Sequence, residues 1–140
     1  MIYPISKQFL AYTETPSFKV ELMDLALVGD AVILMFIRNA SYKRLRFTSP
    51  QHHSEFDGRF KSNDLFIRFC REQSLFPGTS GKTSADYLEA YWGWLHINRR
   101  QNQLDRALND YFLWYLTTMK TNPVRMSCPL LRQRFPLFFV

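Results

Sequence analysis

Apolar side chains recur at helical spacing along most of the chain, and few segments show the alternation typical of a strand. The longest such segment runs from Phe18 to about Asn39, with Ser17 as its candidate N-cap. Its regularly spaced apolar positions are Leu22, Leu25, Ala26, Gly29, Val32, Ile33 and Phe36. Most of the remaining positions in this segment are apolar too. A helix of this kind is expected to be buried or to be shared with a partner.

Proline, glycine and clusters of polar residues divide the rest of the chain into shorter pieces. A short polar segment lies between Pro4 and Pro16, and residues 41–58 are interpreted as a short helical or irregular connection. Another helix is expected to begin at Ser62 or Asn63, either of which can serve as the N-cap.

Two more helices complete the expected fold. They run from about Thr83 to Asn98 and from about Gln103 to Lys120, and the first of them follows a loop over residues 77–81. The second is expected to stop before Pro123, because the residue that precedes a proline disfavours helical geometry. The pattern as a whole predicts an all-α protein.

The length of 140 residues fits one domain, with a core from about residue 17 to residue 120 and a C-terminal tail over residues 121–140. A hydrophobic content of 46%, with 13 phenylalanines, is enough for a core and excludes disorder for most of the chain. No apolar run reaches the roughly 18 to 20 residues that a membrane span needs. Cys70 and Cys128 are too few for a disulfide scaffold, which favours an intracellular location, in the cytoplasm or an organelle.

Basic residues outnumber acidic ones, 18 to 12, and the resulting net charge of +6 favours a polyanionic partner. The candidate phosphate contacts are Lys43, Arg44, Arg46 and Lys82. Side chains of this type neutralise phosphates without reading a base sequence. Ordinary solvated charge is the alternative interpretation of these positions.

Three carboxylates stand in unusually apolar surroundings. Asp86 and Glu89 are three residues apart in a largely apolar helical segment, so both project from one face. Asp30 interrupts the apolar run of the long helix, where a lone carboxylate is costly unless it is paired, capped or bound to a metal. Magnesium takes oxygen ligands of this kind, and a cation relieves the repulsion between neighbouring carboxylates. A solvated acidic face is the alternative for the pair Asp86 and Glu89.

Three segments resemble motifs of the ribonuclease III family, in the order in which that family carries them. The family signature E-F-L-G-D-A-V resembles Leu27-Val28-Gly29-Asp30-Ala31-Val32, its S-N-x-x-L helix start is similar to Lys61-Ser62-Asn63-Asp64-Leu65, and its A-D-x-x-E-A motif resembles Ala85-Asp86-Tyr87-Leu88-Glu89-Ala90. The resemblance covers about residues 20–115. In length, and in the expected lack of an appended double-stranded-RNA-binding domain, the chain is similar to mini-ribonuclease III.

The resemblance implies an all-helical, ribonuclease III-like domain that forms a homodimer through the signature helix and cleaves double-stranded or structured RNA. It implies that Asp30, Asp86 and Glu89 hold Mg²⁺, or Mn²⁺ in its place, with Asp30 and Glu89 as catalytic residues. The metal would activate a water molecule and stabilise the charge that develops on the phosphate. Asp57, which precedes the S-N motif, is similar to an acidic residue of the family, at a shorter interval.

Small and apolar side chains around Gly29 would allow two helices to approach each other closely. We therefore expect Leu27, Val28 and Ala31 to face the partner in a homodimer.

The sequence departs from the family at Ala26, where the signature has Glu, so one acidic ligand is missing. One alternative is therefore a catalytically inactive ribonuclease III-fold subunit that binds RNA or protein, for example in a mitochondrial ribosome. In another, a different subunit supplies the missing acid. A third alternative is a helical protein that only resembles these motifs.

Overall fold

The computed structural model describes residues 5–43 and 50–121, and all regular elements in these two ranges are helices. In chain order they are α1 (Lys7–Thr13), α2 (Pro16–Lys43), α3 (Pro50–Phe60), α4 (Asn63–Glu72), α5 (Lys82–Ile97) and α6 (Gln101–Thr121). The prediction of an all-α protein is confirmed. No helix within these ranges is both long and apolar enough to cross a membrane.

The expected boundaries are wrong at several helix ends. Helix α2 begins at Pro16 and extends to Lys43, so Ser17 lies inside the helix and is not its N-cap. A proline suits the first helical position, because the N–H that it lacks would have no partner there. By contrast, Ser62 is the N-cap of α4, and its hydroxyl accepts a hydrogen bond from the Leu65 N–H at 3.4 Å.

Helix α1 lies in the segment that was expected to be only a polar start to the chain. Its N-cap is Ser6, whose hydroxyl accepts a hydrogen bond from the Phe9 N–H at 3.5 Å. Phe9 is completely buried, and its ring packs against those of Phe18 and Tyr91. This buried aromatic side chain helps to attach a short helix that the sequence pattern did not predict.

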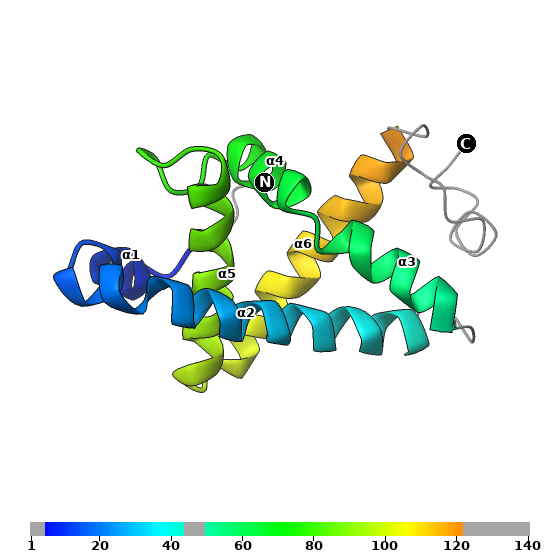
Figure 1. Cartoon of the computed structure of the whole chain (residues 1–140), viewed down its shortest axis with the longest axis horizontal. Coiled ribbons are helices and arrows are strands. Elements are labelled where there is room, and N and C mark those ends of the chain that lie inside the picture. The colour runs from blue at the N-terminus through cyan, green and yellow to red at the C-terminus, as the bar shows by residue number, and fades with distance from the viewer. Residues whose placement is uncertain (1–4, 44–49, 122–140) are drawn as a thin grey trace.

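Helices α2 and α5 cross each other and share the most extensive contact between any two of the described elements (Figure 1). A Cβ atom on Gly29 would lie 1.8 Å from the carbonyl oxygen of Glu89, and one on Gly93 would lie 2.1 Å from that of Leu25. The two backbones are therefore in direct contact, and only glycine permits this approach. The crossing brings Asp30, which follows Gly29, close to Glu89.

The core around this crossing is rich in aromatic rings. The large, almost fully buried side chains are Phe9, Phe18, Phe56, Phe60, Phe66, Phe69, Trp92, Tyr111 and Tyr115. The Tyr111 hydroxyl donates a hydrogen bond to the carbonyl oxygen of Phe60 at 2.9 Å, so the polar atom of this buried ring is satisfied. These contacts tie α3, α4 and α5 to α6.

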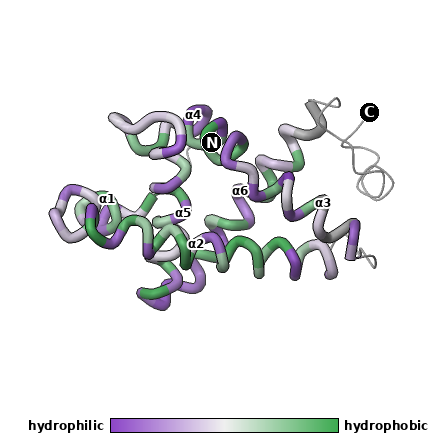
Figure 2. The backbone as a smooth tube through the Cα atoms, in the orientation of Figure 1, coloured by the Kyte–Doolittle hydropathy of each residue, from purple (hydrophilic) through white to green (hydrophobic). Residues whose placement is uncertain are grey.

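Helix α2 is buried along one face only, although its middle is strongly hydrophobic (Figure 2). The residues on its inner face are Leu25, Ala26, Gly29, Ile33, Ile37 and Ala40. Apolar side chains on the opposite face remain largely exposed: Val20, Met23, Leu27 and Met35. Of the two alternatives for α2, burial on all sides does not occur within the single chain, and a shared outer face stays a prediction.

Candidate carboxylate site

Carboxyl groups from two helices lie beside the crossing of α2 and α5. Gly29 packs against the backbone of Glu89, and Asp30 is the next residue on α2. Asp86 lies one turn before Glu89 on α5. Asp30, Asp86 and Glu89 are all partly buried, and the charges of the first two act on the third.

Glu89 is the carboxyl group that these surroundings change most. Burial, followed by the negative charges of Asp30 and Asp86, raises the pKa of Glu89 from 4.5 to about 7. The positive charges of Lys61 and Lys82 act in the opposite direction. Glu89 therefore exchanges its proton near neutral pH, as a general acid or base must.

Lys61 is part of this site and was not among the predicted site residues. Its ammonium nitrogen Nζ lies 2.8 Å from Asp30 Oδ1, and only 19% of its side chain is exposed. It comes from the turn between α3 and α4, just before the N-cap of α4. The one indication of Lys61 in the sequence is its place at the start of the segment that resembles the S-N motif. Its contact with Asp30 could not be predicted, because the two residues are far apart along the chain.

Asp57, the other acidic residue that is similar to one of the family, forms an ion pair between two helices. Its Oδ2 atom pairs with Arg38 Nε at 3.1 Å, and its side chain is 10% exposed. The carboxylate thus joins α3 to α2, whereas the charges that act on Glu89 belong to Asp30, Asp86, Lys61 and Lys82. The similarity of Asp57 to an acidic residue of the family stays a prediction, and its ion pair gives it a structural role.

The chemistry of the donor set suits a hard divalent cation, since three carboxyl groups offer only oxygen ligands. The arrangement of these carboxyl groups fits a metal site less well than their chemistry does. Among the residues that the structure describes, no three or more His, Cys, Asp or Glu side chains form a group that could hold a metal ion. Ala26, which replaces the family's glutamate, is buried and offers no donor atom, and Asp30 is already paired with Lys61.

The predicted phosphate contacts are spread over the molecule. Lys82 is the first residue of α5, is exposed, and acts electrostatically on Glu89, so it lies at the carboxylate site. Lys43 is exposed at the end of α2, about 20 Å along the helix from Asp30. Arg44 and Arg46 lie outside the described residues.

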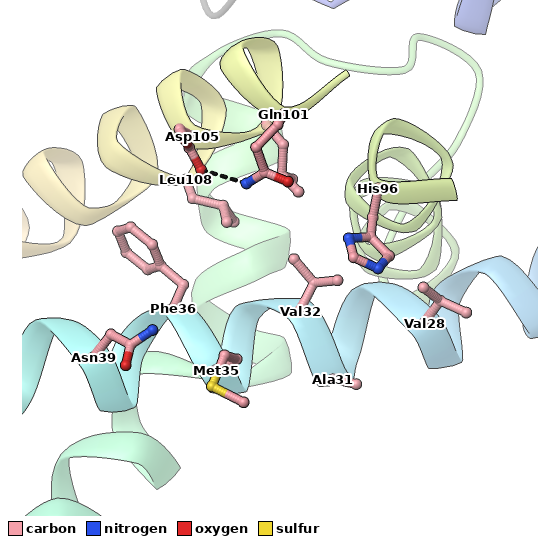
Figure 3. A pocket seen from close by; sticks show the side chains of 11 residues that line it. Val28, Ala31, Val32, Met35, Phe36, Asn39, His96, Gln101, Asp105 and Leu108 are labelled. Atoms are coloured by element: carbon pink, nitrogen blue, oxygen red, sulfur yellow. Dashed lines mark hydrogen bonds between the residues drawn. The ribbon is translucent and has the colours of Figure 1, made fainter. Parts of the chain in front are cut away.

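The predicted dimer residues lie on the outer side of α2. Leu27 is 71% exposed, Ala31 is exposed, and Val28 is half-buried. Val28 and Ala31 line an open groove of about 470 Å³ between α2, the end of α5 and the start of α6 (Figure 3).

Most of the residues that line this groove are apolar. Two of its polar residues are hydrogen-bonded to each other, with Gln101 Nε2 donating to Asp105 Oδ1 at 2.7 Å. Asp30, Asp86 and Glu89 are not among the residues that line it. The groove and the carboxylate site are therefore separate features of the surface.

Comparisons with models of protein families, with curated proteins and with solved structures give no match for this chain. Its function is therefore inferred from the arrangement of its own residues.

Proposed function

We propose that this chain is an endoribonuclease of the ribonuclease III type, which hydrolyses double-stranded or structured RNA with the help of magnesium. The observation that most supports this function is that the charges of Asp30 from α2 and Asp86 from α5 both act on the partly buried Glu89 of α5. These are the acidic residues of the two motifs that resemble the family. The all-helical architecture is compatible with a ribonuclease III-like domain.

In this reaction water adds to the phosphorus atom and the bond to the 3′ oxygen breaks, which leaves a 5′-phosphate and a 3′-hydroxyl. Asp30, Asp86 and Glu89 would hold Mg²⁺ or Mn²⁺, which activates water and stabilises charge on the phosphate. Without a cation the pKa of Glu89 is raised to about 7, and a bound divalent cation would favour its charged, ligating form. Lys82 supplies a positive charge for the RNA backbone beside the site, and Lys43 supplies one further along α2.

The proposed enzyme is a homodimer in which a second copy covers the outer face of α2. Val20, Met23, Leu27 and Met35 are each more than half exposed on this face, and exposed apolar side chains that follow one helix face favour association. Leu27, Val28 and Ala31 are the proposed contacts. Cleavage sites in the two copies would then act on the two strands of one RNA.

A cleavage assay tests the proposed activity. The purified chain is incubated with long double-stranded RNA and Mg²⁺, in parallel with Asp30→Asn, Glu89→Gln and, as a matched control, Glu14→Gln. Glu14 is exposed at the C-cap of α1, away from the carboxylate site. We expect the parent and the control to cleave, and each site variant to lose at least about 100-fold in rate. Cleavage that survives both site substitutions would refute the proposed active site.

A catalytically inactive RNA- or protein-binding subunit is the second candidate function. Two observations favour it: Ala26 places a buried methyl group where the family has a carboxylate, and Lys61 pairs with Asp30. A chain of this kind would bind RNA or a partner protein, for example in a mitochondrial ribosome. RNA binding without cleavage at any concentration of Mg²⁺ or Mn²⁺ would favour this function over the first.

A further inference from the structure

The junction of α1, α5 and α6 gathers positively charged side chains. Arg99 and Arg100 lie in the turn between α5 and α6, at the opposite end of α5 from Lys82 (Figure 1). Lys7 begins α1, and Arg106 lies on α6. Arg100 is partly buried, and the other three cations of the junction are exposed. Among the residues that the structure describes, no carboxylate forms an ion pair with any of these four cations.

Arg100 is held in place by contacts with three parts of the chain. Its guanidinium carbon lies 4.7 Å from the centre of the Trp94 ring, whose face attracts a cation. Its Nη2 atom donates a hydrogen bond to Oε1 of Gln8 on α1, and its backbone N–H donates to the carbonyl oxygen of Leu95 at 2.9 Å. A guanidinium has five N–H donors in a planar arrangement that suits phosphate. Arg100 therefore presents further donors from a fixed position.

A small pocket lies in the same junction. Its volume is about 200 Å³, and its lining comes from the start of α1, from α5 and from α6: Ile5, Ser6, Tyr91, Gln103, Arg106 and Ala107. The charge of Arg100 acts on Tyr91, and Lys7 directly follows Ser6, so both cations lie near this pocket. Pockets for drug-sized ligands measure about 300–1,000 Å³, so this one suits a single small group.

The cations are spaced along the surface and do not converge on one point. The Arg100 carbonyl oxygen accepts a hydrogen bond from the Leu104 N–H, so Arg100 already belongs to the helical ladder of α6. Arg106 follows it at about 9 Å along the helix axis and on nearly the same side. Asp110, one turn further on, forms no ion pair with Arg106 in the described part of the chain. A row of this length suits successive phosphates of a polymer better than one small anion.

We propose that the surface formed by Lys7, Arg100 and Arg106 around this pocket binds the phosphate backbone of double-stranded or structured RNA. The contact does not depend on base sequence, because cationic side chains neutralise phosphates without reading base edges. The inference rests on the proposed function only in that RNA is the partner, and it applies equally to an inactive RNA-binding subunit. It requires no metal ion.

RNA binding in the absence of cleavage tests this surface. The fluorescence anisotropy of a short labelled RNA duplex is titrated, in EDTA and at several salt concentrations, with the parent chain and with Lys7→Gln, Arg106→Gln and Arg106→Lys. Lys19→Gln is the matched control, since Lys19 is exposed on α2, does not line the pocket, and its substitution also removes one positive charge.

We expect Lys7→Gln and Arg106→Gln each to bind RNA at least about fivefold more weakly than the parent at low salt. Each should also reduce the slope of log affinity against log salt concentration by about 1, because one phosphate contact is lost. Arg106→Lys keeps the charge and should retain most of the affinity, and Lys19→Gln should stay within about twofold of the parent. Binding that both test variants weaken no more than Lys19→Gln does would overturn the inference.

A second measurement uses the parent chain without substitutions. The RNA duplex should protect Lys7 from an amine-labelling reagent more than it protects Lys19, as measured by mass spectrometry of the labelled peptides. Equal protection of the two lysines would contradict the proposed contact, even if a variant failed to fold. Protection of Lys7 by vesicles of anionic phospholipid, and not by RNA, would assign this surface to a membrane and overturn the RNA contact.

These outcomes are distinguishable from those of the cleavage assay. RNA binding that depends on Lys7 and Arg106, without cleavage by any variant, would retain this surface and reject the nuclease. Cleavage that depends on Asp30 and Glu89, together with unchanged RNA binding by Lys7→Gln and Arg106→Gln, would retain the proposed function and reject this surface.

Discussion

At the scale of single residues, Glu89 and Asp57 show how neighbouring groups determine the role of a carboxyl group. Glu89 is partly buried beside two other carboxyl groups, and its pKa rises to about 7. Asp57 is more deeply buried, but Arg38 supplies an opposite charge at 3.1 Å. One group is poised to exchange a proton, and the other holds two helices together.

The raised pKa of Glu89 predicts a specific dependence of stability on pH. Between the usual pKa of 4.5 and the folded value of about 7, the folded protein holds a proton that the unfolded chain releases. The contribution of Glu89 to the free energy of unfolding is therefore constant below about pH 4.5, falls as the pH rises towards 7, and is constant again above it.

We expect Glu89→Gln to stabilise the protein at pH 8 relative to its effect at pH 4, because the amide is never charged. The difference should be about 1 kcal/mol, since solvent screens part of the interaction. Thermal unfolding at both pH values without divalent cations measures it, with Glu14→Gln as the control. An equal effect of Glu89→Gln at the two pH values would show that its ionisation does not oppose folding.

At the scale of helices, the contact between α2 and α5 depends on two glycines. Gly29 and Gly93 let the backbones touch, and this contact positions Asp30 and Glu89 relative to each other. A periodic pattern predicts each helix separately, and it also identified Gly29 as a place where a helix can approach closely. It did not identify α5 of the same chain as the helix that approaches. The small residues around Gly29 by themselves predict an approach by a partner chain.

Gly93→Ala is expected to destabilise the protein by about 1–3 kcal/mol, because the added Cβ atom meets backbone that has little freedom to move. Its ideal position is 2.1 Å from the carbonyl oxygen of Leu25. Denaturant unfolding followed by circular dichroism measures the loss. Gly58→Ala is the matched control, since nothing lies within 4 Å of its Cβ position and alanine favours the helix by up to about 1 kcal/mol. A smaller loss for Gly93→Ala than for Gly58→Ala would contradict the tight crossing.

At the scale of the whole molecule, the outer face of α2 and the groove beside it leave apolar surface exposed on the described part of the chain. Leu27 is the clearest example, with 71% of its surface exposed near the middle of the longest helix. The sequence alone allowed Leu27 to pack inside one chain or against a second copy. Its exposure shows that it does not pack inside one chain.

Leu27→Asp is expected to convert the proposed dimer into a folded monomer, because a carboxylate at an exposed position disturbs the interface without entering the core. Light scattering after size-exclusion chromatography gives the mass, and circular dichroism checks the helix content. Leu113→Asp on α6 is the control, since Leu113 is also exposed, at 57%, and lies on another helix. A parent chain that is monomeric at all concentrations would contradict the dimer.

Features encoded within a few neighbouring residues could be predicted from the amino-acid sequence. The helix start at Ser62, the periodic core positions of α2, and the shared face of Asp86 and Glu89 follow from capping and from the helical repeat. Helix α1 could not, because its buried residue Phe9 packs against Tyr91, in a distant part of the chain.

The contact of Lys61 with Asp30 and that of Asp57 with Arg38 arise only when α3 and the turn after it pack against α2. The partners in each pair are many residues apart and follow no periodic pattern. Their proximity results from the way in which whole helices fill a common core. The acidic residues of the candidate site could therefore be identified from the sequence. The pairing of Lys61 with Asp30 is found only in the folded chain.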